Sequence, residues 1–121
     1  MVLESWLEEL YDHLNEKHFG KRLPKVKIRI CAHVRAAPWN PQYEEITRAF
    51  MGTTRWDSRG RPKEIVLYKR ALPTKDDWEQ TLLHEMIHVE QLLEGREPKH
   101  DKKFIQRAKE LGLPSEVSYD G

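Results

Sequence analysis

The sequence of 121 residues contains a single cysteine, Cys31, and its formal net charge is only +1. One cysteine excludes an intrachain disulfide bond and suits a reducing compartment. No apolar stretch approaches the length of a membrane span, and the first residues lack the basic and apolar regions of a secretory signal. A net charge near zero gives no overall attraction to nucleic acid. We therefore expect a cytoplasmic protein that does not insert into membranes.

The composition and the hydrophobic pattern predict one α+β domain. Apolar residues make up 38% of the chain and charged residues 34%, which is typical of a globular protein with one modest core. Segments with helical spacing of apolar residues alternate with shorter β-type segments. We expect helices over residues 3–18, 74–94 and 100–111, strands over residues 25–31, 46–56 and 64–69, a loop over residues 35–45, and a flexible tail over residues 113–121.

A glycine-containing turn over residues 57–62 separates the last two expected strands, and such a turn is typical of an antiparallel hairpin. We therefore predict a small, mostly antiparallel three-stranded sheet. The helix over residues 74–94 should pack on one face of it. Because 121 residues suffice for a single modest core, we assign residues 1–121 to one domain, and we expect a monomer.

The most informative segment is His84-Glu85-Met86-Ile87-His88, in the middle of an expected helix that begins after Thr74 and ends near Gly95. Residues four apart lie on the same face of a helix, so both imidazoles can reach one metal ion while Glu85 stands beside them. This H-E-x-x-H pattern is typical of zinc peptidases. The alternative is a polar seam of histidines on a surface helix, but the surrounding apolar residues favour a half-buried metal site.

A catalytic zinc ion needs three protein ligands and an open position for water. Glu90 and Glu94 point away from the direction of His84 and His88, because successive helical residues are rotated by about 100°. His100 is the best third ligand, since a turn followed by a returning helix brings the first residues of that helix back over the site. Glu97 remains the second choice, as in zinc enzymes with a carboxylate third ligand.

These residues resemble a known family, the SprT-like zinc metallopeptidase domain, which includes Spartan-type proteases of DNA–protein crosslinks. The resemblance covers about residues 3–111. It is carried by the run Thr81-Leu82-Leu83-His84-Glu85-Met86-Ile87-His88 with His100 and Phe104, by residues 10–24, by Gly52-Thr53-Thr54, and by Ile65-Val66-Leu67. In one departure, Asp101 stands where the family commonly has glycine after its third histidine.

The resemblance implies a zincin-like minimal metallopeptidase with one Zn²⁺ per chain, held by His84, His88 and His100. It implies that Glu85 is the catalytic base for a zinc-activated water that attacks peptide bonds of a polypeptide substrate. In such peptidases an extended substrate pairs with an edge strand beside the cleft. We expect the strand over residues 64–69 to have this role, with Tyr68 as the candidate substrate-binding residue.

Basic residues gather locally, over residues 21–29 and 55–63, and Trp39 or Trp56 offers a surface for stacking. They could contact the phosphates of single-stranded DNA, or DNA-bound proteins, but a solvated strand edge and turn is the more common reason for such residues. The sequence contains neither a cysteine-rich zinc ribbon nor a long basic tail after residue 111, which are accessory modules of some members of the family.

Two other functions stay open. The first is a nucleic-acid-associated binding module with a structural or non-proteolytic zinc site. A structural zinc ion is more often closed by a fourth Cys or His, for which Cys31 is the one cysteine available. An intact Glu85 argues against that interpretation, because a structural site needs no base. The second is a metal-dependent hydrolase that cleaves another bond, and a closed pocket rather than an open groove would favour it.

Overall fold

The structure is a computed structural model that describes residues 3–31, 52–69, 72 and 74–113. Its elements, in chain order, are α1 (Leu3–Phe19), β1 (Lys27–Cys31), β2 (Gly52–Trp56), β3 (Pro62–Tyr68), α3 (Lys75–Leu93) and α4 (Lys102–Glu110). The predicted α+β class is confirmed, with element ends shifted by a few residues. The expected loop over residues 35–45, the first part of the expected strand over residues 46–56, and residues 114–121 of the expected tail lie outside the described residues.

The three strands are arranged in the order β1-β3-β2. β2 and β3 form the predicted antiparallel hairpin, in which Thr54 lies opposite Ile65. β1 pairs with β3 in parallel, with Ile28 opposite Ile65, so the sheet is mixed. The turn over residues 57–62 is a local signal for the hairpin, whereas a parallel pairing joins segments that are far apart in the sequence. The sequence pattern therefore predicted one pairing and not the other.

This strand order overturns one expectation. We predicted that the strand over residues 64–69 is an edge strand that pairs with the substrate, but β3 is hydrogen-bonded on both sides and lies in the centre of the sheet. The prediction was wrong because the sequence of a hairpin does not indicate which of its two strands pairs with a third strand. Within the described residues, β2 is an edge strand, and it also contacts α3.

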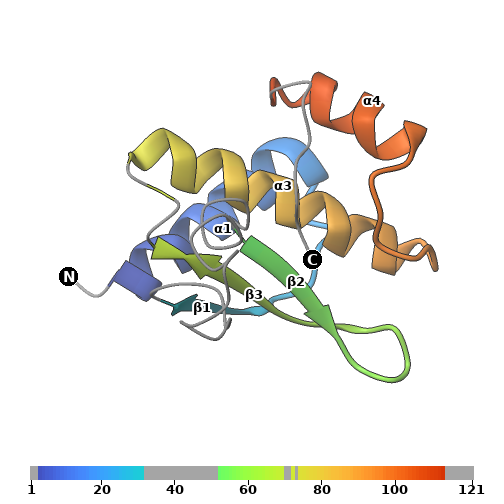
Figure 1. Cartoon of the computed structure of the whole chain (residues 1–121), viewed down its shortest axis with the longest axis horizontal. Coiled ribbons are helices and arrows are strands. Elements are labelled where there is room, and N and C mark those ends of the chain that lie inside the picture. The colour runs from blue at the N-terminus through green and yellow to red at the C-terminus, as the bar shows by residue number, and fades with distance from the viewer. Residues whose placement is uncertain (1–2, 32–51, 70–71, 73, 114–121) are drawn as a thin grey trace, which may run out of the picture.

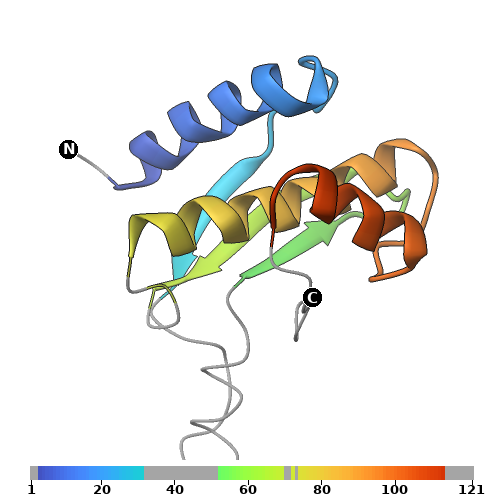
Figure 2. The ribbon, with the colours of Figure 1, turned by 90° about the horizontal axis from the view of Figure 1, so that it is seen from above.

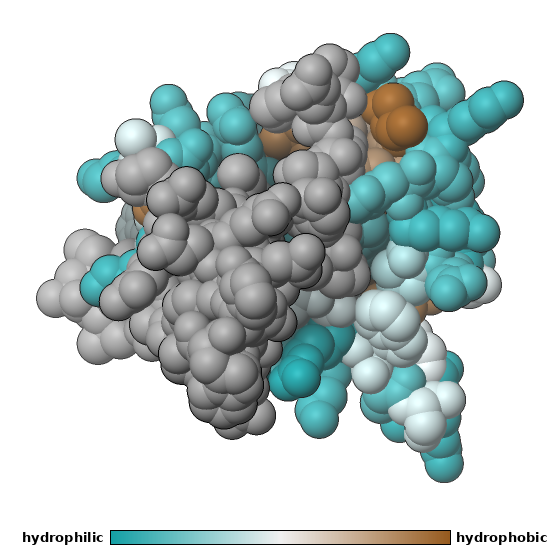
Figure 3. All heavy atoms as spheres, viewed as in Figure 1, coloured by the Kyte–Doolittle hydropathy of each residue, from teal (hydrophilic) through white to brown (hydrophobic). Residues whose placement is uncertain are grey.

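Helices α1 and α3 lie side by side on one face of the sheet, and α4 packs against α3 on the side away from α1 (Figures 1 and 2). The core between these layers includes side chains that are at most 1% exposed, among them Leu14, Ile65, Leu67, Leu82 and Met86. Hydrophilic side chains cover most of the described surface that is visible in Figure 3. None of the described helices is long and apolar enough to cross a membrane.

Both ends of α3 are fixed by the signals that the sequence carries. The Thr74 hydroxyl accepts a hydrogen bond from the Asp77 N–H at 3.2 Å, and the Asp77 carboxylate accepts one from the Thr74 N–H at 3.0 Å. At the other end, Gly95 has a φ of 72°, a conformation that favours glycine. The Arg96 N–H then donates to the Gln91 carbonyl at 2.8 Å. The predicted helix ends are confirmed.

One glycine allows β2 to lie close to α3. A Cβ atom at Gly52 would be 3.0 Å from the Val66 carbonyl oxygen, 3.1 Å from Leu67 Cδ2 and 3.1 Å from Thr81 Cγ2. Two of these atoms belong to the neighbouring strand and one to the helix above. A larger residue at this position would therefore have to displace the neighbours of β2 by a few tenths of an ångström.

We expect Gly52→Ala to lower the free energy of unfolding. Overpacking of a dense interior typically costs about 1–3 kcal/mol, and the loss of unfolded-state entropy on replacing glycine offsets about 0.4–1 kcal/mol of it. Urea unfolding of the metal-free protein measures the change. The control is Thr53→Val, on the opposite face of the same strand, which keeps the branched shape. Equal stability of Gly52→Ala and the wild-type protein would contradict the close approach.

Candidate metal centre

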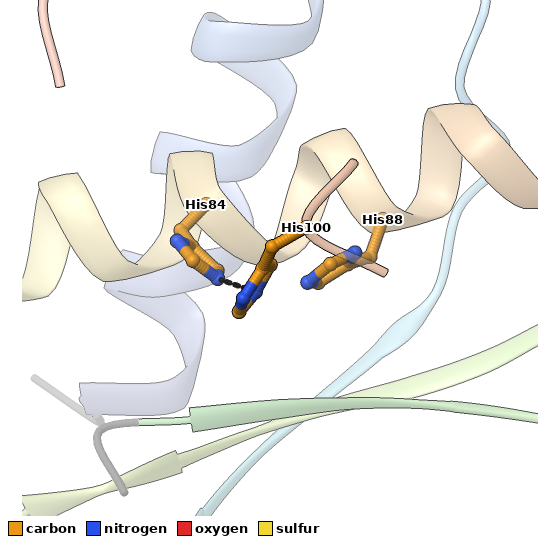
Figure 4. A group of neighbouring side chains, drawn as sticks. All are labelled: His84, His88 and His100. Carbon is orange, nitrogen blue, oxygen red and sulfur yellow. Dashed lines mark hydrogen bonds between the residues drawn. The ribbon is translucent and has the colours of Figure 1, made fainter. Parts of the chain in front are cut away.

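Three imidazole rings converge in the part of the chain that the structure describes. His84 and His88 extend from α3, and His100 comes from the segment that precedes α4 (Figure 4). One ligand atom of each residue lies within 4.8 Å of those of the other two. His88 is fully buried, whereas His84 and His100 are half-buried. The structure thus brings together the three residues that the sequence nominates as metal ligands.

The donor set suits a zinc ion. Zinc in proteins prefers nitrogen and sulfur ligands in a tetrahedral arrangement, with Zn–N distances of about 2.0–2.1 Å. Two nitrogens on one tetrahedral ion are therefore about 3.3 Å apart, and the Nε2 atoms of His84 and His100 are 3.1 Å apart. Three imidazole nitrogens leave one tetrahedral position for water or substrate. Among the described residues, the group that could hold a metal ion consists of these three histidines.

A buried phenylalanine packs against all three rings. The centroid of the Phe104 ring is 4.9 Å from that of His84, 4.8 Å from that of His88 and 4.7 Å from that of His100. Phe104 is in the first turn of α4 and is only 1% exposed. It therefore forms an apolar wall of the centre, and contact on this side limits the rotation of the rings.

Asp101 lies between His100 and α4 and joins the preceding turn to that helix. Its carboxylate accepts hydrogen bonds from Arg96 Nη2 at 2.9 and 3.0 Å and caps α4 by accepting one from the Phe104 N–H at 2.9 Å. The Phe104 N–H and the Arg96 guanidinium lower the pKa of Asp101. Asp101 thus begins the helix immediately after His100 and ties it to the preceding turn.

Gln91 links the second histidine to the segment that carries the third. His88 Nδ1 lies 2.7 Å from Gln91 Oε1, which also accepts a hydrogen bond from the Lys99 N–H at 3.2 Å. Gln91 Nε2 donates to the Lys99 carbonyl at 2.8 Å. Our sequence analysis missed this residue, although Gln91 follows His88 by three positions and so lies on the same helical face.

Glu85 is completely buried and is held by β2. The Thr54 hydroxyl lies 2.8 Å from Glu85 Oε1 and 3.0 Å from the Glu85 carbonyl oxygen, and it donates its single proton to these acceptors. Alternation along β2 points Thr54 to the same face as Gly52, toward α3. Glu85 thus follows His84 on the helix and contacts the edge strand of the sheet. Thr54 is a second supporting residue that the sequence pattern did not reveal.

The other carboxylates near the motif are occupied elsewhere or are remote. Glu90 accepts hydrogen bonds from Arg22 Nη2 at 2.7 Å and from Arg107 Nε at 3.1 Å. Burial of Glu94 opposes its ionisation, but hydrogen bonding to Arg96 and the charge of Lys103 outweigh it, so the pKa of Glu94 is lowered. Glu97, the second choice as third ligand, is exposed and is not a member of the histidine group.

The remaining candidates lie away from this centre. Tyr68 alternates with Leu67 on β3, so it faces away from the core side that α3 covers, and burial raises its pKa. The role of Tyr68 as a substrate-binding residue stays a prediction, and the charge of Glu85 also contributes to its raised pKa. His13 and His18 are on α1 and do not belong to the group, and His33 lies outside the described residues.

Comparison with known proteins agrees with the resemblance seen in the sequence. A sequence model of the SprT-like family matches residues 7–119, almost the whole chain. The comparisons with curated proteins and with solved structures gave no match. The matched region contains every residue of the histidine group, and so the fold and the candidate centre both lie within one family domain.

We expect His100→Ala to weaken zinc binding strongly, because it removes one of three ligands. The loss should exceed the roughly 10–100-fold that follows removal of a partner that only orients a ligand. Competition with a chromophoric chelator measures the affinity. Glu97→Ala is the matched control and should bind zinc as the wild-type protein does. Unchanged affinity in His100→Ala, with a loss in Glu97→Ala, would instead make Glu97 the third ligand.

Proposed function

Because the chain belongs to the SprT-like family, we propose that it is a zinc-dependent endopeptidase that hydrolyses peptide bonds of protein substrates. The observation that carries this proposal is the group of three imidazoles, with Glu85 following the first of them on α3. A protein that only stored or structurally used zinc would need no such carboxylate. Within the part of the chain that the structure describes, the group has three members and Cys31 is not one of them, which argues against a structural site closed by this cysteine.

A zinc ion held by His84, His88 and His100 would act as a Lewis acid and make water a nucleophile near neutral pH. Glu85 would accept a proton from the attacking water and pass it to the leaving amine. The hydrogen bond from Thr54 fixes the orientation of Oε1. Phe104 excludes water from one side of the centre, so the charges act in a less polar medium.

We assign the substrate-pairing role to β2 instead of β3. β2 has one strand neighbour among the described residues, and Thr54 in its middle contacts Glu85. A polypeptide in extended conformation could add to the open edge of such a strand through backbone hydrogen bonds. Its peptide groups would then run past the catalytic carboxylate, which favours a polypeptide over a small molecule. We further propose, from the sequence, that the enzyme acts in the cytoplasm as a monomer.

We expect Glu85→Gln to keep zinc affinity near that of the wild-type protein and to lose cleavage of an unfolded protein substrate. General acid–base catalysis contributes about 10²–10⁴-fold to the rate, so the loss should lie in that range or above. Gel-based cleavage with the zinc-loaded protein measures it. Glu97→Gln is the matched control, because it makes the same chemical change at an exposed position. Full turnover by Glu85→Gln would refute the assignment of the base.

A second, narrower proposal is that the peptidase acts on proteins bound to single-stranded DNA. The β2–β3 hairpin projects from the domain, and its turn is polar in the space-filling view (Figures 1 and 3). Trp56 at the end of β2 is 41% exposed, and Arg59 and Lys63 nearby are exposed as well. An exposed aromatic ring flanked by cations suits base stacking and phosphate contact. Arg61 is partly neutralised by Asp57, at 3.1 Å.

We expect Trp56→Ala to weaken binding of single-stranded DNA, because stacking of one base on an aromatic ring contributes about 1–3 kcal/mol, equivalent to roughly 5–150-fold. Fluorescence anisotropy of a labelled oligonucleotide at fixed salt measures the change. Leu93→Ala, at the other large apolar side chain that is exposed in the described structure, is the control. If the wild-type protein and Trp56→Ala bind DNA equally, or neither binds, the hairpin is not a DNA-binding surface.

A further inference from the structure

We propose that Gln91 is a positioning residue for the metal centre, which selects the nitrogen of His88 that binds the metal and holds His100 in place. This inference rests on the proposed zinc site but not on the reaction that the site catalyses. Gln91 is on α3 and is 1% exposed. Its side chain contacts one candidate ligand directly and the residue before another.

The orientation of the Gln91 amide is fixed by the backbone of Lys99. The Lys99 N–H can only donate, and it lies 3.2 Å from Gln91 Oε1. The Lys99 carbonyl can only accept, and it lies 2.8 Å from Gln91 Nε2. Exchanging the oxygen and nitrogen of the amide would place a donor against a donor and an acceptor against an acceptor. The atom that faces His88 is therefore the oxygen.

This orientation determines the tautomer of His88. Because Gln91 Oε1 is an acceptor, His88 Nδ1 must carry the proton in the 2.7 Å hydrogen bond. In a neutral imidazole with a proton on Nδ1, the lone pair is on Nε2, and only a nitrogen with a lone pair can bind a metal. A ligating histidine commonly has its other nitrogen fixed by a hydrogen bond of this kind. Here a buried amide takes the place that a carboxylate often has.

The Gln91 amide also holds the backbone of the residue that precedes the third candidate ligand, His100. Its two hydrogen bonds hold both polar backbone groups of Lys99, the residue immediately before His100. Gln91 is nearly inaccessible to water, so loss of these bonds would leave polar groups unsatisfied or force the segment to move. The Gln91 side chain therefore fixes both the tautomer of His88 and the position of His100.

Asn15 is a suitable control position for Gln91, because it is also a buried amide that binds the backbone of a later residue. Asn15 on α1 is buried, its Nδ2 donates to the Leu23 carbonyl at 2.9 Å, and its Oδ1 accepts from the Leu23 N–H at 3.2 Å. Like Gln91, it holds both backbone groups of a residue eight positions later. Asn15 has no contact with the histidine group among its hydrogen bonds. It therefore separates the cost of losing a buried amide from an effect on the metal.

The experiment compares zinc affinity, by chelator competition, in the wild-type protein, Gln91→Met and Asn15→Leu, with thermal unfolding of each metal-free protein. We expect Gln91→Met to lose about 10–100-fold in zinc affinity, the range for a lost ligand-orienting partner. Asn15→Leu should lower the melting temperature but leave zinc affinity within about twofold, because distant sites rarely couple. Equal affinity losses in the two variants, or no loss in Gln91→Met, would overturn the proposal.

Two further measurements keep the test decisive if Gln91→Met does not fold. The first is the long-range ¹H–¹⁵N spectrum of the zinc-loaded wild-type protein, which should show His88 protonated at Nδ1 and bound through Nε2. The second is Gln91→Glu, which keeps the acceptor for His88 and the Lys99 N–H, and should bind zinc more tightly than Gln91→Met.

Metal bound at Nδ1 of His88, or a Gln91→Glu variant no better than Gln91→Met, would contradict the assignment. These readouts do not involve turnover, so they distinguish the inference from the proposed activity. Zinc binding in the expected geometry without peptidase activity would leave the role of Gln91 intact and refute only the reaction. A wild-type protein that binds no zinc would refute both.

Discussion

The helical period of α3 is the constraint on which the rest of the structure depends. Successive residues are rotated by about 100°, so His84, His88 and Gln91 share one face, at positions i, i+4 and i+7. Leu82 and Met86 face the core. Glu85 lies between these two directions, which explains why it is buried against the sheet while its neighbour His84 belongs to the histidine group. The sequence position of a residue on α3 therefore decides whether it is a candidate ligand, the candidate base or a core residue.

The features that the sequence predicted are those that depend on residues close together in the chain, as the helical period does. The caps at Thr74 and Gly95 and the convergence of His84 and His88 depend on residues that are close in the chain, and the structure contains these features. The position of His100 also followed from a local argument, a turn and a returning helix. The strand order β1-β3-β2 did not, because it depends on how distant segments meet. For the same reason the partner of Glu85, a threonine 31 positions earlier, was not found.

A buried carboxylate on α3, that of Glu90, is paired with two arginines near the histidine group. Glu90 is only 8% exposed, and an isolated carboxylate there would carry a large desolvation cost. Arg22, after α1, and Arg107, on α4, both donate to it. Arg107 also lies over the ring of Phe19, 4.9 Å from its centroid, and donates to the His18 carbonyl. Removing one partner of a buried pair is costly, so this group ties the three helices together and fixes α4, whose first turn supplies Phe104.

The edge strand β2 contacts the candidate base, Glu85, and is also the strand with which we propose that the substrate pairs. Gly52 and Thr54 point to the same face of β2, where the first allows close approach to α3 and the second holds Glu85. The backbone of that strand also has an open side among the described residues. A substrate paired there would be positioned relative to the strand, and the strand is positioned relative to the base through Thr54. Substrate binding and proton transfer would then both depend on the position of β2, so a shift of this strand by about 1 Å would disturb both. The close approach of β2 to α3 at Gly52 limits such a shift, because the backbone of the strand already lies close to the Thr81 side chain of the helix there.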